Sequence, residues 1–121
     1  MKRSLELVKL ILEHFENKED WSYEENINIE GYDSKLISYH IDLLYEAGLI
    51  NGEASTSQTG RIYDVLPFRL TWEGHEFLEN VKDNSRWKKI KQIIAQKGGN
   101  FSFELIKKLA FNLAEQQLLG S

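Results

Sequence analysis

Stretches in which apolar residues recur every three or four positions alternate with polar stretches along the chain. Residues 3–15 form the first apolar stretch, and its spacing predicts a helix with one buried side. Ser4 stands where an N-cap residue is expected. Residues 17–26 are polar and acidic and predict a loop, whereas Ile27-Asn28-Ile29 alternates in the manner of a short strand.

A second helix is predicted from about Ser34 to Ala47, with Asp33 as its N-cap. Gly48 follows as a left-handed C-terminal cap, and Leu49 and Ile50 begin a strand. The side of this helix that we expect to face the core is apolar apart from one histidine, and consists of Leu36, Ile37, His40, Ile41, Leu43 and Leu44.

The small, polar residues 51–60 predict the flexible tip of a hairpin, after which extended character resumes in residues 61–66 and 68–70. Pro67 lacks the N–H that a strand ladder needs, so we expect a bulge or an edge position there. A further helix, capped by Thr71, is predicted to continue to about Val81.

Two more helices complete the chain. The first is predicted at residues 86–97, capped by Asn84 or Ser85 and ended by Gly98-Gly99. Its Trp87, together with Trp72 of the preceding helix, is expected to anchor the core. The second opens at Asn100 or Ser102 and extends to about Leu119.

The last helix is apolar over more than half of its circumference, which is wider than the stripe that a surface helix needs. A second copy of the chain would cover the surplus in a homodimer, since small proteins commonly pair through symmetric contacts. Burial between two elements of its own domain is the alternative.

The order of helix, strand, helix, hairpin and three helices is that of a winged helix. The fold class predicted is therefore α+β: a winged helix-turn-helix-like domain with a small antiparallel sheet and a C-terminal helical extension. We expect the winged-helix-like domain at residues 1–84 and the extension at 85–121, packed on the same domain. A length of 121 residues suits this organisation.

Charge is uneven along the chain, although the net value is only −4. Residues 1–60 hold 5 Lys and Arg against 12 Asp and Glu, whereas residues 61–121 hold 10 against 7. The acidic balance argues against tight non-specific binding of nucleic acid. The densest basic stretch, 82–97, is either a solvated helix face or a local binding patch.

Two segments resemble bacterial winged-helix regulators. Residues 38–50, which contain Tyr39-His40 and Ala47-Gly48-Leu49, are similar to the end of their recognition helix, and residues 70–78 are similar to the segment that follows their wing. The resemblance implies contact with double-stranded DNA through helix residues and wing residues. These residues are Ser34, Lys35, Ser38, Tyr39 and, at the edge, His40 in the helix, with Gln58 and Arg61 in the wing.

Nearly the whole chain resembles a family of small bacterial and phage-encoded proteins, domain of unknown function 2513, which implies no particular activity. The matching residues include Met1-Lys2-Arg3, Gly31-Tyr32, Tyr39-His40, Ala47-Gly48-Leu49-Ile50, Leu70-Thr71-Trp72-Glu73-Gly74-His75, Trp87 and Gly98-Gly99-Asn100-Phe101-Ser102-Phe103-Glu104. One departure from ordinary helix-turn-helix proteins is important. Residues 21–30, where their scaffold helix belongs, are too polar and acidic, so we expect this helix to be shortened or missing.

No catalytic or metal-binding pattern stands out. Cysteine is absent, which excludes disulfides and thiolate zinc sites, and no two histidines share the spacing of metal ligands. His40 borders the apolar side of its helix, so a hydrogen-bonded structural histidine is the favoured interpretation over a ligand. We expect no enzyme activity and no cofactor.

The sequence also bears on location. No apolar run approaches the roughly 20 residues that a membrane span needs, and charges interrupt the first apolar stretch. We therefore expect a cytoplasmic protein.

The leading hypothesis is a DNA-binding or transcription-associated winged-helix module, dimeric through its last helix. The rival is a winged-helix-like adaptor, phage-encoded in origin, that binds a protein and not DNA. The acidic first half and the missing scaffold helix favour the rival.

Overall fold

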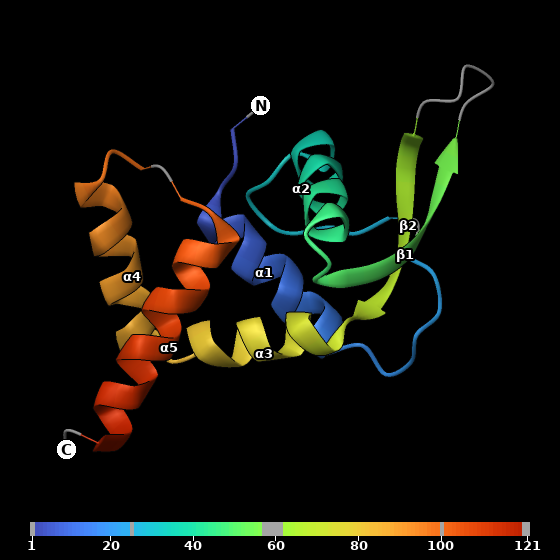
Figure 1. Cartoon of the computed structure of the whole chain (residues 1–121). Helices are drawn as coiled ribbons and strands as arrows, with labels where there is room; N and C mark the ends of the chain where they lie inside the picture. The colour runs from blue at the N-terminus through green and yellow to red at the C-terminus, as the bar shows by residue number, and fades with distance from the viewer. Residues whose placement is uncertain (1, 25, 57–61, 100, 120–121) are drawn as a thin grey trace. The chain divides into compact units, whose positions relative to one another are not determined.

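The computed structural model describes residues 2–24, 26–56, 62–99 and 101–119. Five helices and one antiparallel pair of strands lie within these residues (Figure 1), so the chain is α+β as predicted. Its contacts divide it into two compact units, Met1–His75 and Glu76–Ser121. The packing of a C-terminal extension on the first part of the chain stays a prediction.

The first helix, α1 (Leu5–Glu16), begins where its cap was predicted. The hydroxyl of Ser4 accepts a hydrogen bond from the backbone N–H of Leu7 at 3.2 Å. This bond satisfies one of the N–H groups that a helix start leaves free. The apolar stripe of the helix is buried, and its members are Leu5, Leu7, Val8, Ile11, Leu12 and Phe15.

The second helix, α2 (Ser34–Glu46), is also capped as predicted. The Asp33 carboxylate accepts from the backbone N–H of Lys35 at 2.7 Å. After the helix, Gly48 adopts φ 78°, which is the left-handed conformation expected of a C-terminal cap. Four residues of α2 are buried, namely Ile37, His40, Ile41 and Leu44.

The strand predicted at residues 27–29 is wrong: between α1 and α2 the described residues contain neither helix nor strand. Ile27 is buried there although it belongs to no strand. The expectation that the scaffold helix is missing is confirmed over the described residues.

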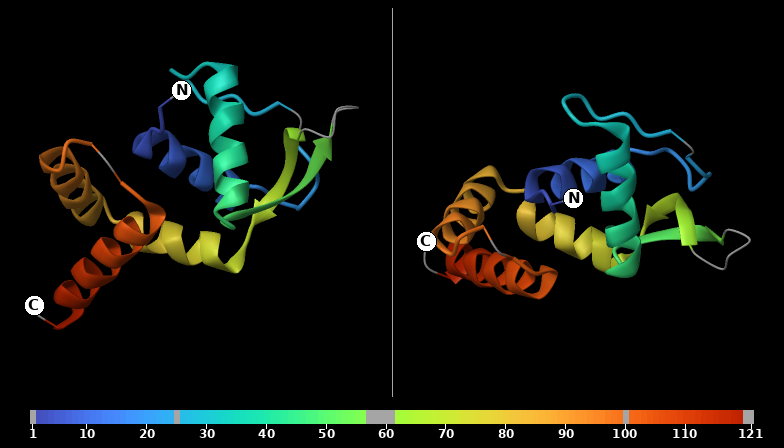
Figure 2. Two further views of the ribbon diagram at one scale, coloured as in Figure 1. Left: turned by 45° about the horizontal axis from the view of Figure 1, so that its top comes forward. Right: turned by 90° about the horizontal axis from the view of Figure 1, so that it is seen from above.

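The hairpin consists of β1 (Ile50–Thr56) and β2 (Ile62–Leu70), which pair in antiparallel register. Asn51 pairs with Arg69 and Gly52 with Pro67, so Phe68 is an extra residue on β2. The bulge predicted beside Pro67 is confirmed. Both views in Figure 2 show the hairpin leaving the end of α2, with α1 on the other side of that helix.

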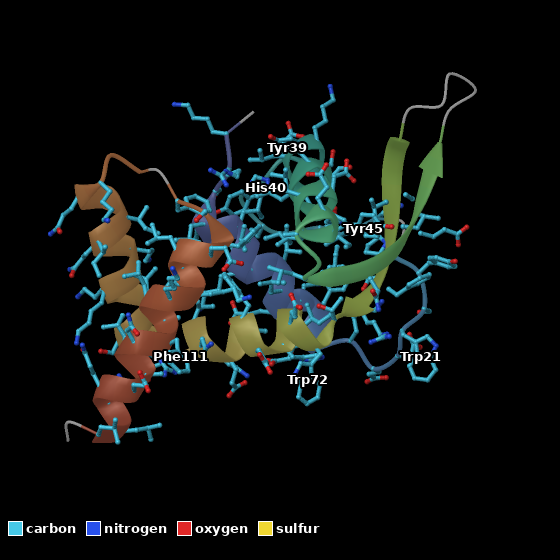
Figure 3. The ribbon with its side chains drawn as sticks, in the orientation of Figure 1. Trp21, Tyr39, His40, Tyr45, Trp72 and Phe111 are labelled. Carbon is cyan, nitrogen blue, oxygen red and sulfur yellow. The ribbon has the colours of Figure 1, made fainter. Side chains whose placement is uncertain are left out.

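The third helix, α3 (Trp72–Val81), follows β2 directly. Thr71 holds the junction, since its hydroxyl donates to the carbonyl of Gly48 at 2.6 Å and accepts from the N–H of Gly74 at 2.9 Å. The prediction that Trp72 anchors the core is wrong. The residue is 78% exposed, and its ring points away from α3 (Figure 3). The buried side of α3 is instead Gly74, Phe77, Leu78 and Val81.

The second unit contains α4 (Asn84–Gln96) and α5 (Phe103–Leu119). The cap of α4 is Asp83, one residue before the predicted choices, and its carboxylate accepts from the N–H of Arg86 at 2.9 Å. Trp87 is buried as predicted, and Gly98 and Gly99 end the helix with positive φ angles. Ser102 caps α5 through the N–H of Leu105.

Candidate nucleic-acid interface

The side of α2 that faces away from α1 holds most of the predicted contact residues. Ser34 and Lys35 are exposed in its first turn, and Ser38 and Tyr39 are half-buried one turn later. All four lie in the first six residues of the helix. In helix-turn-helix proteins, it is the N-terminal residues of the recognition helix that reach base edges.

Ser34 and Ser38 also line a hollow of about 220 Å³ between α2, the segment before it and β2. Glu24 and Asn26 add polar groups to the hollow, and apolar residues form the rest of its wall. Those residues are Ile27, Ile37, Ile41, Val65, Leu66 and Pro67. The two serines therefore lie at the junction of the helix and the hairpin.

His40 has a different place from the other predicted contacts. It is fully buried, and its Nε2 accepts from the N–H of Ser4 at 2.7 Å. Because that nitrogen is the acceptor, Nδ1 carries the proton and donates to the Leu36 carbonyl at 2.9 Å. Burial lowers the pKa of His40, which favours the neutral ring. His40 joins α2 to the start of α1 and does not face the surface.

The two contacts predicted in the wing, Gln58 and Arg61, lie outside the described residues. Within the described residues, β2 contacts both α1 and α2. The hairpin and the helix thus form one structural unit within Met1–His75.

Charge changes along α2. Lys35 is in the first turn, whereas Asp42 and Glu46 follow two and three turns later on the same outward side. At 1.5 Å per residue, Asp42 stands about 10 Å further along the helix axis than Lys35. The carboxylate of Asp33 caps the helix start through the N–H of Lys35. The helix therefore has a polar beginning, where the charges of Asp33 and Lys35 balance, and an acidic end.

The segment that replaces the scaffold helix is tied to the bulge of β2. Lys18 donates from Nζ to the Phe68 carbonyl at 2.6 Å, and the backbone N–H of Glu24 donates to the Pro67 carbonyl at 3.2 Å. The Glu24 carboxylate lies 3.4 Å from Lys18 Nζ and 2.8 Å from His14 Nε2. We call Lys18, Glu24 and their bonds to β2 the loop clamp. Sequence reasoning missed it, because its residues meet only through the fold.

Exposed aromatic rings are a second feature that the sequence did not predict. Trp21 is 74% exposed and points outward from the loop, and Trp72 is 78% exposed (Figure 3). A separate hollow of about 220 Å³ includes Trp21, Arg69 and His75 in its lining. The acidic residues Glu16, Glu19 and Asp20 also line it.

Neither a metal-binding site nor a membrane-spanning helix is found in the described part of the chain. No group of three or more His, Cys, Asp or Glu residues there is placed to hold a metal ion. No helix among the same residues combines the length and the apolar character that crossing a membrane requires.

Comparison with known proteins shows which protein family the chain is related to. The model of one protein family, described as hypothetical protein (DUF2513), matches residues 2–100. The chain belongs to the DUF2513 family. An uncharacterized protein of Haemophilus influenzae is 32% identical over 119 residues, which cover 98% of this chain and 99% of that protein. No solved structure matches the chain. The DUF2513 match includes α1 to α4, and thus the helix and hairpin described above.

Proposed function

We propose that this DUF2513 protein is a winged-helix-like module that binds double-stranded DNA, without catalysis, through the first half of α2 and the hairpin. Support comes from the layout of the unit Met1–His75, in which a helix turns at Gly48 into an antiparallel hairpin. A recognition helix followed by a β-ribbon is the arrangement that winged-helix proteins use for DNA.

The observation that carries this proposal is the order of polar groups along α2. Ser34 and Lys35 are exposed in the first turn, Ser38 and Tyr39 follow half-buried one turn later, and the carboxylates of Asp42 and Glu46 lie about 10 Å and 16 Å beyond Lys35 along the helix axis. A helix that enters the major groove by its N-terminal end brings the lysine and the hydroxyls near the bases and keeps the two carboxylates away from the phosphates.

The loop clamp supports the same function mechanically. A recognition helix must be held rigidly, and in helix-turn-helix proteins the scaffold helix does this. Here His40 ties α2 to α1, and the loop clamp ties the preceding segment to β2. α2 is therefore held by its packing on α1 and by the His40 hydrogen bond, while the loop clamp fixes the loop that stands in the place of the scaffold helix.

Fluorescence anisotropy with a labelled duplex of about 30 base pairs at low salt tests the proposal. Non-specific affinity falls in the range of roughly 10⁻⁴ to 10⁻⁶ M, so wild-type protein should saturate the signal at high micromolar concentration. Lys35→Glu should weaken binding about tenfold, because a contacting cation becomes a repelling anion. Lys2→Glu is the control, since it makes the same change of charge at an exposed position outside α2.

A specific observation favours a second function, that of an adaptor for a protein partner. The unit Met1–His75 carries 7 Lys and Arg against 14 Asp and Glu, and it exposes both Trp21 and Trp72. Exposed tryptophans are typical centres of protein interfaces. If the protein fails to bind DNA at high micromolar concentration and low salt, the adaptor function replaces DNA binding.

We also propose that the chain forms a homodimer through α5. Phe111, Leu118 and Leu119 on this helix are 56%, 82% and 83% exposed, respectively. Phe111 and Leu118 are seven residues apart and so lie on the same side of the helix. Symmetric pairing of two copies would remove this apolar surface from water.

A further inference from the structure

Positive charge is concentrated in α4 and the turn that follows it. Residues 84–103 contain five Lys and Arg and no Asp or Glu, whereas the rest of the chain contains 10 against 19. This stretch of 20 residues therefore has a positive net charge within a chain whose net charge is negative. Segregation of this strength creates a local positive potential even in a protein with negative net charge.

The structure puts Lys88 and Lys89 of α4 on the side opposite to its apolar residues. Trp87, Ile90 and Ile94 form the buried side. The exposed side combines lysines with side-chain amides and a hydroxyl, all of which donate hydrogen bonds to phosphate oxygens. Its members are Ser85, Lys88, Lys89, Gln92 and Gln96, and we call them the α4 basic face.

The α4 basic face is available for an external anion. Lys88 and Lys89 are exposed and form no ion pair with any described residue. Asp83, the acidic residue nearest to them in the sequence, is engaged as the N-cap through the N–H of Arg86. That bond holds the pKa of the Asp83 carboxyl below its usual value. Lys91 lies over the Trp87 ring at 5.7 Å from its centre, at the edge of the face.

We propose that the α4 basic face binds the phosphate backbone of double-stranded DNA and supplies most of the electrostatic part of the affinity. This inference rests on the proposed DNA-binding function and assigns the phosphate contacts to the unit Glu76–Ser121. An anionic membrane is disfavoured as the partner, because a helix that lies on a membrane needs an exposed apolar side. The apolar side of α4 is buried within the protein.

The number of cations on the face sets the expected salt dependence. Lys88 and Lys89 lie on the face and Lys91 lies at its edge, so about two or three phosphates can be neutralised. Each neutralised phosphate contributes about −0.9 to the slope of log K against log salt, so the face should contribute about −1.8 to −2.7. Binding should then weaken roughly 12- to 40-fold between 50 and 200 mM salt.

The experiment measures this slope by anisotropy with a 30-base-pair duplex of arbitrary sequence. The test variant combines Lys88→Gln and Lys89→Gln, and the matched control combines Lys107→Gln and Lys108→Gln, which removes the same charge from α5 of the same unit. We expect the test variant to reduce the magnitude of the slope by 1 to 2, while the control keeps the wild-type slope. Circular dichroism of each variant establishes that the helices are intact.

The outcomes separate the two proposals. If wild-type protein binds the duplex and both double variants keep the same slope, the assignment to α4 is overturned and DNA binding through α2 stands. If wild-type protein does not bind at 50 mM salt, DNA binding and the assignment both fail. Binding to phosphatidylserine vesicles but not to the duplex would also overturn the inference, in favour of a membrane.

Discussion

Close approach of two backbones explains one glycine of the chain. A Cβ atom added to Gly74 would lie 2.0 Å from the carbonyl oxygen of Leu49, a backbone atom held by the end of α2 and the start of β1. Helix propensity alone would make alanine the better residue in α3 by about 1 kcal/mol. The contact with Leu49 reverses this preference, because neither backbone can move freely.

We therefore expect Gly74→Ala to lower the free energy of unfolding by about 2–3 kcal/mol. The change is measured by urea denaturation, with His75→Ala as a control at an exposed position of the same helix. The control should stay within about 0.5 kcal/mol of the wild type. A Gly74→Ala protein as stable as the wild type would mean that α3 does not pack so closely on Leu49.

The burial of His40 predicts that the free energy of unfolding depends on pH. Burial lowers its pKa below that of an exposed histidine, about 6.5, so the unfolded chain binds more protons than the folded one in acid. The contribution of His40 to stability is full above about pH 6.5 and declines as the pH falls below it. The decline is at most about 1.4 kcal/mol per pH unit for a single group.

His40→Gln should remove this part of the decline, since a glutamine keeps an acceptor for the Ser4 N–H but does not titrate. Urea denaturation at a series of pH values between 5 and 8 compares the two proteins. Parallel profiles would show that another group, and not His40, sets the acid sensitivity of the fold.

At the scale of single residues, sequence patterns predicted the helix caps and turns well. The caps Ser4 and Asp33 and the turn at Gly48 depend on neighbours in the chain, and all three were predicted. Asp83 was missed by one position, since Asn84 and Ser85 are also good caps. The exposure of Trp72 was not predictable, because a bulky apolar side chain at a helix start is usually buried.

At the scale of elements, the loop before α2 depends on the loop clamp. Lys18→Met keeps the length of the side chain but removes its bond to the Phe68 carbonyl and its ion pair with Glu24. We expect faster amide hydrogen exchange in residues 19–30, with little change in α1. The fold should persist, because the apolar contacts of α1 and α2 are unaffected.

Lys9→Met serves as the control, since Lys9 pairs with Glu13 within α1 and lies far from the loop in the sequence. Hydrogen exchange measured by mass spectrometry reports both variants. Unchanged exchange in residues 19–30 of Lys18→Met would mean that Lys18 does not hold this segment.

The helices and the hairpin were predictable as elements because each has its own apolar period and its own end signals. The strand expected at residues 27–29 was not, since alternation over three residues does not specify a pairing partner. The loop clamp and the hollow beside Ser34 and Ser38 arise from contacts between distant segments. Such contacts leave no signal in a single sequence.

For the whole molecule, the proposed homodimer predicts a solution mass of about 28 kDa, twice that of the 14.1 kDa chain. Combined Phe111→Ser and Leu118→Ser should give a folded monomer, because they remove the exposed apolar pair of α5. Light scattering coupled to size-exclusion chromatography measures the mass, with Gln116→Ser as the control at an exposed position on the other side of the same helix. A wild-type monomer at high micromolar concentration would contradict the proposal.

The central claim is that the first half of α2 and the hairpin contact DNA. Its most direct test is a nuclear magnetic resonance titration of ¹⁵N-labelled protein with a short DNA duplex, followed through the backbone amides. The account predicts the largest shift changes in residues 34–39 and in the described residues of β1 and β2, together with changes along α4. If the duplex binds while the amides of α2 and the hairpin keep their shifts, the claim is contradicted. The absence of any shift change at a large excess of duplex would also contradict it.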